Sequence, residues 1–412
     1  MCVAWLLLFV CEKLAMKINT GKGAIPLVTL VAILSVSAVV SLPGLAISPI
    51  LDDISRIFPH SAELEVSMLE SLPSLMIIPF MLLAGRWSVD KNNIRILVIG
   101  TVIFLLSGIW SLLSTHLVEL IIASTIMGIG AGMIIPLSTG LIVQYFTGNQ
   151  RVRQLGVSSA VNNLTLVVAT SLVGYLADVS WHLAFVVYLL PLVTLVLIPT
   201  IRNTKPEPEP HDGAQNRQTA LNLRVIVGLM LFYFAITYLS LIVTFNTSYL
   251  AAERGLSDER SGLIISLFFL AIMAPGFVLD RIVAWLGKWL NFVSLVVMGL
   301  GLVLMALRHT PVAMLWIGAV LAGLGYGVMQ PVVYDKAATN APPRLYTLAL
   351  SLVMAVNYLA ILVAPFIIDL TDELFHATHH RLAYLVNGVL TLVLALVTLL
   401  LLRRSPVLGS DD

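Results

Sequence analysis

Three asparagines interrupt apolar stretches of this chain, where a polar side chain must find a hydrogen-bonding partner. Asn162 and Asn163 lie inside the apolar run 154–177, and Asn357 lies inside the run 345–369. A carboxamide has two N–H donors and a carbonyl acceptor, and leaving it unpaired in an apolar medium is costly. The residues alone permit two interpretations. Each amide either bonds a neighbouring helix, for about 0.6 kcal/mol on average, or contacts a polar ligand in a wet cavity.

Other polar side chains inside apolar runs are candidates for the same site. Tyr358 follows Asn357 directly and offers a ring for stacking and a hydroxyl for hydrogen bonding. The remaining candidates of this kind are Asn246, Tyr326 and Gln330.

Glu70 is an ionisable residue inside the apolar run 65–85, with Pro73 and Pro79 after it. An ionisable side chain within a membrane span indicates function by default, because burying it is expensive. We therefore expect the Glu70 carboxyl to bind and release protons. The alternative is a carboxylate near the end of its run that reaches out to water.

The composition excludes an ordinary soluble protein. Apolar residues make up 59% of the 412 positions, charged residues 11%, and the mean hydropathy is +0.98. Soluble proteins usually carry about 25% charged residues. The net charge is +1, and no basic stretch suggests nucleic acid binding. The spacings typical of nucleophile, metal and phosphate sites are missing, so we expect no enzyme activity, no cofactor and no metal.

Apolar runs recur along the whole chain, and a run of roughly 20 residues can cross a bilayer as a helix. The pattern indicates an all-α membrane protein with twelve transmembrane helices. The predicted runs are 25–50, 65–85, 94–114, 118–142, 154–177, 181–201, 223–247, 260–281, 289–307, 311–334, 345–369 and 382–402.

A polar interruption separates six of these runs from the other six. It contains the sequence TKPEPEP at 204–210, and alternating Pro and Glu form neither a helix nor a packed core. Residues 1–15 have two interpretations, a flap on the membrane surface or a stretch before a true start at Met16. The predicted organisation is an N-terminal segment 1–24, a six-helix bundle 25–201, a linker 202–222, a second six-helix bundle 223–404 and a tail 405–412.

The two halves share an internal repeat. The segment GIGAG at 128–132 returns as GLGYG at 323–327, which is 195 positions later, and the same offset relates Asn162 to Asn357 and Pro136 to Pro331. A constant offset over successive apolar segments indicates a duplication and predicts two bundles related by a pseudo-twofold axis. We expect the repeated glycines to lie along one side of each helix, where small residues allow close helix packing.

The 23 Lys and Arg residues are distributed unevenly between the loops. When the loops are assigned alternately to two sides, most basic residues fall on the side of the amino terminus and the Pro-Glu linker. Loops rich in Lys and Arg stay in the cytoplasm. We therefore predict a multi-pass protein of the cell membrane with both termini and the linker in the cytoplasm. The exceptions, on the opposite side, are Arg56, Arg254, Arg260, Arg308 and Arg381.

Short motifs make residues 25–404 resemble the major facilitator superfamily of secondary transporters. That family has a Gly-x-x-x-Asp-Arg-type loop after its second span. The segment 276–281, GFVLDR, has this spacing, and the segment 85–91, GRWSVDK, has one more residue between Gly and Asp. The glycine-rich segment 128–136 is similar to the family's fourth span. The segment 181–185, WHLAF, is similar to the turn into its sixth span.

The resemblance implies two six-helix bundles that expose a central cavity to each side of the membrane in turn. It assigns Gly85, Asp90, Asp280 and Arg281 to a cytoplasmic gate. The sequence departs from the family pattern in two places. Ser124 stands where many proton-coupled members have Arg, and the Gly-Pro signature that drug antiporters carry in their fifth span is missing.

These observations predict a secondary transporter that moves a small, neutral or weakly amphipathic organic solute by alternating access, coupled to protons and directed outward. No Lys or Arg lies mid-span to hold an anion. Two alternatives remain open: solute uptake by symport or facilitated diffusion, and a membrane receptor, scaffold or lipid scramblase that transports no solute. The expected partners are the solute, protons and the lipid bilayer, with the protein as a monomer and without nucleic acid.

Overall fold

The computed structural model describes most of the chain. The described residues are 17–21, 23–43, 45–59, 63–90, 92–201, 221–256, 258–307, 311–374 and 380–401. Residues 1–16 of the predicted N-terminal segment 1–24, most of the linker 202–222 and the tail 405–412 lie outside the described residues. The side chains of Glu70 and Asp90 also lie outside them, although both residues belong to a described helix.

The described chain forms two compact units. Unit 1 consists of residues up to 154, together with 168–221 and 341–352. Its helices begin with the short α2 (Leu27–Val39), which follows an antiparallel pair of strands, β1 (Lys17–Asn19) and β2 (Ala24–Pro26). The other elements are η1 (Leu45–Ile50), α3 (Leu51–Ile57), α4 (Glu63–Asp90), α5 (Asn93–Leu113), α6 (Leu117–Tyr145), α8 (Trp181–Ala184), η2 (Phe185–Leu189), α9 (Pro191–Leu197) and η3 (Ile198–Thr200).

Unit 2 consists of residues 155–167, 222–340 and 353 onward. Its elements are α10 (Leu223–Glu253), α11 (Asp258–Met273), η5 (Ala274–Phe277), α12 (Leu279–Leu286), η6 (Gly287–Trp289), α13 (Leu290–Ala306), α14 (Val312–Thr339) and α16 (Arg381–Leu401). Two long helices contribute to both units. The middle of α7 (Gly148–Val179) belongs to unit 2, and the start of α15 (Tyr346–Leu374), with η7 (Pro343–Leu345), belongs to unit 1.

The helical membrane architecture expected from the sequence is confirmed. Among the described residues, eleven helical segments are long and apolar enough to cross a membrane, and α2 is a shorter apolar helix. The first predicted run, 25–50, is therefore not one continuous helix. Helix α2 ends at Val39, and a 3-10 helix, η1, resumes at Leu45. Pro43 lies between them, and its ring supplies no backbone N–H to continue the α-helical hydrogen bonds.

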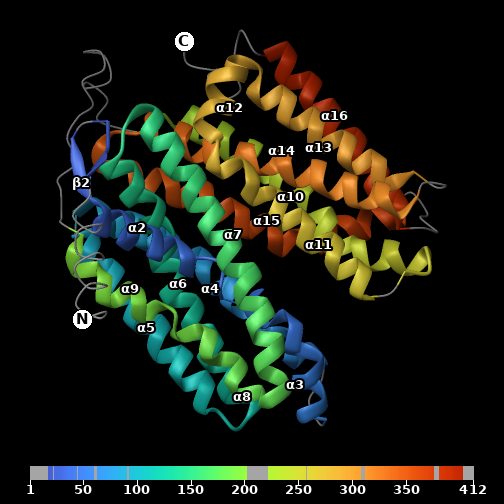
Figure 1. Cartoon of the computed structure of the whole chain (residues 1–412), viewed down its shortest axis with the longest axis horizontal. Coiled ribbons are helices and arrows are strands. Elements are labelled where there is room, and N and C mark those ends of the chain that lie inside the picture. Colours follow the sequence, from blue (N-terminus) through green and yellow to red (C-terminus); the bar gives the residue numbers. More distant parts are fainter. Residues whose placement is uncertain are drawn as a thin grey trace, which may run out of the picture. The chain divides into compact units, whose positions relative to one another are not determined.

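The same arrangement of three helices occurs in each unit. In unit 1, α6 packs against both α4 and α5, and in unit 2, α14 packs against both α11 and α13. Figure 1 shows the first group in blue to green and the second in yellow to orange.

The contacts of the repeated glycines follow the sequence offset. A Cβ atom added at Gly128 lies closest to Pro73, and one added at Gly323 lies closest to Phe268. Both the glycines and their partners are 195 positions apart. The internal repeat therefore extends from the sequence to the packing of the helices.

The expectation that these glycines line one side of each helix is wrong. Gly132 approaches Ile77 of α4, whereas Gly130 approaches Gly100 and Phe104 of α5. The physical reason is that each helical residue turns by about 100°, so that alternate residues point in nearly opposite directions. The glycines of α6 thus allow close packing on two neighbouring helices at once.

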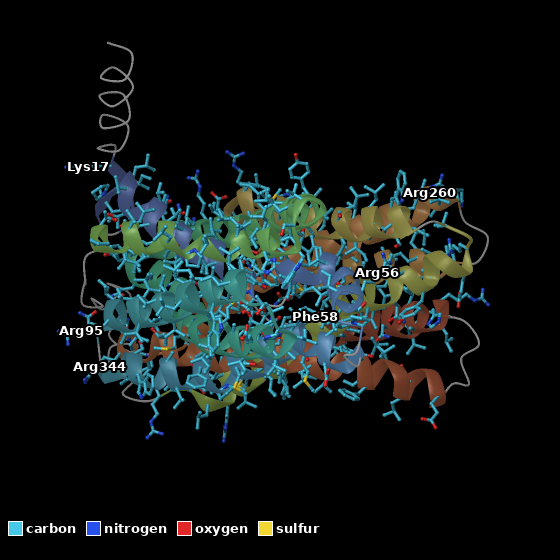
Figure 2. The ribbon with its side chains drawn as sticks, turned by 90° about the horizontal axis from the view of Figure 1, so that it is seen from below. Lys17, Arg56, Phe58, Arg95, Arg260 and Arg344 are labelled. Atoms are coloured by element: carbon cyan, nitrogen blue, oxygen red, sulfur yellow. The ribbon has the colours of Figure 1, made fainter. Side chains whose placement is uncertain are left out.

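Figure 2 shows how several basic residues of unit 1 are distributed along its helices. Lys17, Arg95 and Arg344, which the sequence assigns to the side of the amino terminus, lie at one end of this unit. Arg56, assigned to the opposite side, lies away from that end. The alternating loop assignment therefore agrees with the helix directions in unit 1.

Candidate functional site

Unit 2 contains a network of hydrogen-bonded polar side chains between its helices, which we call the polar network. The middle of α7 contributes one side chain, α10 two, α14 three and α15 one. Its members are Ser159, Tyr233, Thr237, Tyr326, Gln330, Tyr334 and Asn357.

Gln330 of α14 joins three helices through both ends of its amide. Its Oε1 accepts a hydrogen bond from Ser159 Oγ of α7 at 3.1 Å. Its Nε2 donates to the hydroxyl of Tyr233 on α10 at 3.1 Å and to that of Tyr334 at 3.4 Å. The two tyrosine hydroxyls lie 2.6 Å apart, and their rings meet edge to face at 5.5 Å between centroids. These bonds fix the orientation of the amide.

The second part of the polar network surrounds the carbonyl oxygen of Asn357. Thr237 Oγ1 donates to Asn357 Oδ1 at 3.2 Å, and the Tyr326 hydroxyl donates to the same atom at 3.3 Å. The hydroxyls of Thr237 and Tyr326 are themselves 3.4 Å apart. The Asn357 amide therefore connects α15 to α10 and α14.

Helical spacing explains why these residues converge. Three members lie on α14 at intervals of four residues, namely Tyr326, Gln330 and Tyr334. On α10, Tyr233 and Thr237 are also four residues apart. Residues four apart lie one above the other on a single helix face. Two facing polar stripes, one on each helix, thus produce the polar network.

Six of the seven members of the polar network belong to the second copy of the internal repeat, and Ser159 belongs to the first. At the 195-residue offset, the first half has Ala131, Ile135 and Thr139 in place of the three polar residues of α14. All three are buried in α6. The two copies therefore share their glycine packing but not this cluster of polar side chains.

The seven side chains of the polar network are all uncharged. They combine hydroxyl and amide groups with three aromatic rings, so they can hydrogen-bond a solute and also stack against it. Among the described residues, no group of three or more His, Cys, Asp or Glu side chains is placed to hold a metal ion. Recognition of a neutral molecule is the chemistry that this arrangement offers.

The structure brings together three of the residues proposed from the sequence, Asn357, Tyr326 and Gln330. Tyr358 is half-buried beside Asn357 on α15, and Asn246 is buried further along α10. Asn162 and Asn163 are half-buried on α7. The Asn163 amide donates to the backbone carbonyl of Ser159 in its own helix, at 2.8 Å.

Four members of the polar network were missed by reasoning from the sequence. They are Ser159, Tyr233, Thr237 and Tyr334. Hydroxyl side chains occur throughout apolar helices, so a single one carries little information. The four-residue spacing of polar side chains along α10 and α14 was the signal that could have found them.

The residues assigned to a gate lie at helix ends. Gly85, near the end of α4, packs within unit 1 against Leu348 and Ser351 of α15, and an added Cβ would be 2.7 Å from that of Ser351. Within unit 2, Gly276 of η5 contacts the backbone of Gly156 on α7. Asp280 is half-buried in the first turn of α12, and Arg281 is exposed.

The fold is that of a multi-pass helical membrane protein. The sequence model of the Major Facilitator Superfamily matches residues 27–365 and 288–411, and this chain belongs to that family. It is a transporter rather than an enzyme.

Two curated relatives match parts of the chain. The multidrug transporter protein MdtP of Bacillus subtilis is 27% identical over 168 residues, which are 40% of this chain and 30% of MdtP. The quinolone resistance protein NorA of Staphylococcus aureus is 28% identical over 116 residues, which are 28% of this chain and 29% of NorA. The match therefore spans less than a third of the length of either relative.

Solved structures share the fold over almost the whole chain. The proton:xylose symporter XylE superimposes with a TM-score of 0.73 at 16% identity, over 90% of this chain and 94% of XylE. The human organic anion transporter MFSD10 superimposes with a TM-score of 0.67 at 17% identity, over 89% of this chain and 97% of MFSD10. The Escherichia coli fucose:proton symporter FucP superimposes with a TM-score of 0.71 at 10% identity, over 89% of this chain and 97% of FucP.

Proposed function

We propose that this protein exports a small, neutral or weakly amphipathic organic solute through the cell membrane by alternating access, with both termini in the cytoplasm and as a monomer. The observation that carries the proposal is the uncharged polar network of unit 2. Within the described part of the chain, both hydrogen bonds to the Asn357 side chain use its Oδ1 atom, so its two N–H donors are available to an acceptor on the solute. The rings of Tyr326 and Tyr358 supply the apolar contact that such a solute requires.

The remaining site residues proposed from the sequence complete the cavity in this proposal. Asn162, Asn163 and Asn246 add amide groups on α7 and α10. Export is favoured because the relatives MdtP and NorA are named for multidrug transport and quinolone resistance. Uptake is the second candidate, since two structures with the same fold, XylE and FucP, are described as proton symporters.

We assign proton coupling to Glu70. The full-length protein, reconstituted in liposomes with an imposed pH gradient, is expected to accumulate a quinolone, the compound class in the name of NorA. Replacing Glu70 by Gln removes the exchangeable proton while keeping the size of the side chain. We expect this variant to lose accumulation against a gradient but to retain exchange of labelled quinolone at equilibrium.

A matched control is available on the same helix. Glu65 is exposed on α4 five residues before Glu70, and Glu65→Gln should accumulate the quinolone as the unmodified protein does. Gradient-driven accumulation by Glu70→Gln at the normal rate would refute the assignment. The direction of accumulation relative to the pH gradient distinguishes export from uptake.

We propose that the gate of this cycle is formed by Gly85, Asp90, Asp280 and Arg281 with the helices that they contact. The glycine contact of α4 with α15 must form and separate in every cycle, because it joins helices from different halves of the sequence. Overpacking a tight contact typically costs about 1–3 kcal/mol, so Gly85→Ala should slow transport about tenfold.

A second substitution makes the gate prediction specific. Ser351→Gly removes the side chain that an alanine at position 85 would meet. The double variant Gly85→Ala with Ser351→Gly is expected to regain most of the transport rate. Transport that stays slow in the double variant, with unchanged thermal stability, would contradict this role of the contact.

A further inference from the structure

The short helix α12 carries a large aromatic side chain that the rest of the unit does not cover. Trp285 is 85% exposed, and Trp289 in the following η6 is 45% exposed. Figure 1 shows α12 at one end of unit 2, where it connects the end of α11 to the start of α13. A Trp side chain has an apolar body and one N–H donor, so it is poorly suited to full exposure in water.

Basic side chains accompany the exposed tryptophans. Arg281 lies one helical turn before Trp285 on α12, and Lys288 lies between Trp285 and Trp289 in the chain. Both basic side chains are exposed. The neighbouring Asp280 is only half-buried, but Leu279 and Leu290 at the two ends of the segment are buried and attach it to the unit.

The exposed surface of α12 continues an apolar surface on the adjacent helices. Phe277 and Val278, which precede α12, are exposed, and so are Leu263 and Leu270 of α11 and Leu300 of α13. These two helices belong to segments that are long and apolar enough to span a membrane. The segment that contains α13, Leu279–Ala306, begins with α12. In a membrane the exposed leucines of both helices would face hydrocarbon, with α12 at the end of its span.

We propose that α12 and η6 form a binding surface for the headgroups of anionic phospholipids. Tryptophan is enriched at the boundary between hydrocarbon and headgroups, and Lys and Arg beside it attract lipid phosphates. Trp285 and Trp289 insert at this boundary, while Lys288 and Arg281 contact the phosphate groups. None of the residues of this surface belongs to the polar network, although Arg281 is also one of the residues proposed for the gate.

The test measures how phosphatidylglycerol stabilises the purified full-length protein in detergent against thermal unfolding, with phosphatidylcholine as the zwitterionic comparison. We expect phosphatidylglycerol to raise the Tm more than phosphatidylcholine at equal concentration. A basic residue near an anionic surface contributes about a fivefold gain in affinity. Lys288→Gln should therefore need about fivefold more phosphatidylglycerol for the same rise in Tm, with no change in its response to phosphatidylcholine.

Two matched controls locate the effect at α12. Arg260 is also an exposed basic residue, at the opposite end of α11, a helix that contains no Trp. Arg260→Gln should leave the phosphatidylglycerol response unchanged. Lipid brominated on its acyl chains quenches nearby tryptophans, and Trp285→Phe should reduce this quenching. Trp316 of α14 is 40% exposed, and Trp316→Phe gives the comparison for a tryptophan away from α12.

Three results would overturn the proposal. The first is an equal response to both lipids in the unmodified protein. The second is an equal loss of response in Lys288→Gln and Arg260→Gln, which indicates a general charge effect. The third is unchanged quenching in Trp285→Phe, which places this ring in water.

Discussion

Replacing Gly128 by alanine is expected to destabilise the protein more than almost any other substitution of a single methyl group. An added Cβ would lie 2.5 Å from the carbonyl oxygen of Pro73 and 2.6 Å from its Cα. Both atoms belong to the backbone of α4, so no side-chain rotation can relieve the clash, and the two helices must separate. We expect a loss of about 3 kcal/mol or more, the upper range for overpacking.

The internal repeat predicts the same result in unit 2. Gly323 contacts the backbone oxygen of Phe268, and its added Cβ would be 2.8 Å from that of Ala271. Thermal unfolding of purified Gly128→Ala and Gly323→Ala proteins should show a lowered Tm for both, with a lowered yield of folded protein. The two substitutions act in different units, so their effects should be nearly additive.

Two other helical glycines provide controls with the same chemical change. A Cβ added at Gly174 of α7 or at Gly262 of α11 meets no atom within 4 Å. Alanine at such a position stabilises the folded protein by about 0.4–1 kcal/mol, because it reduces the conformational entropy of the unfolded chain. Equal unfolding temperatures of the Gly128→Ala and Gly174→Ala proteins would contradict the close contact between α6 and the backbone of α4.

Replacing Gln330 by leucine should abolish most transport while the protein still folds. The change removes the acceptor of Ser159 and the donor to Tyr233 and Tyr334. A buried polar group without a partner costs about 1–3 kcal/mol, and the three hydroxyls must reorient to find new partners. We expect quinolone transport by reconstituted protein to fall about tenfold to a hundredfold.

The Asn163→Ala variant separates a general effect of losing an amide from a specific effect of the polar network. The Asn163 amide bonds a carbonyl of its own helix, so its loss should change transport less than Gln330→Leu does. Binding of the quinolone, measured by its effect on Tm, should fall in parallel with transport in Gln330→Leu. Normal binding with slow transport would instead place Gln330 in the conformational change rather than in the site.

The sequence was sufficient to predict the helical membrane fold and part of the polar network. Asn357 was identified because an amide is conspicuous among apolar residues, and Gln330 for the same reason. Tyr233 and Tyr334 were not identified as site residues, because a tyrosine is compatible with an ordinary apolar helix face. Their role depends on the approach of α10 to α14, which only the packing of the helices determines.

The packing of the glycines illustrates another limit. The repeat itself is evident in residues 128–132 and 323–327, and its offset also relates the partners Pro73 and Phe268. The sequence does not say which neighbouring helix each glycine meets. Likewise, it places residues 282–288 in a loop, whereas the chain there forms most of α12, because eight residues are too few for a clear helical pattern.

The restriction of the polar network to α7, α10, α14 and α15 has an evolutionary consequence. Two copies of a duplicated gene begin identical, so the tyrosines and Gln330 of α14, or their loss from α6, arose after the copies were joined. Helix α6, with Ala131 and Ile135 at the positions of Tyr326 and Gln330, could then diverge free of the demands of recognition. A change of cargo during evolution is therefore expected to need new residues chiefly on α10 and α14, which supply five of the seven members of the polar network, and laboratory selection for a different cargo should accumulate most of its substitutions there.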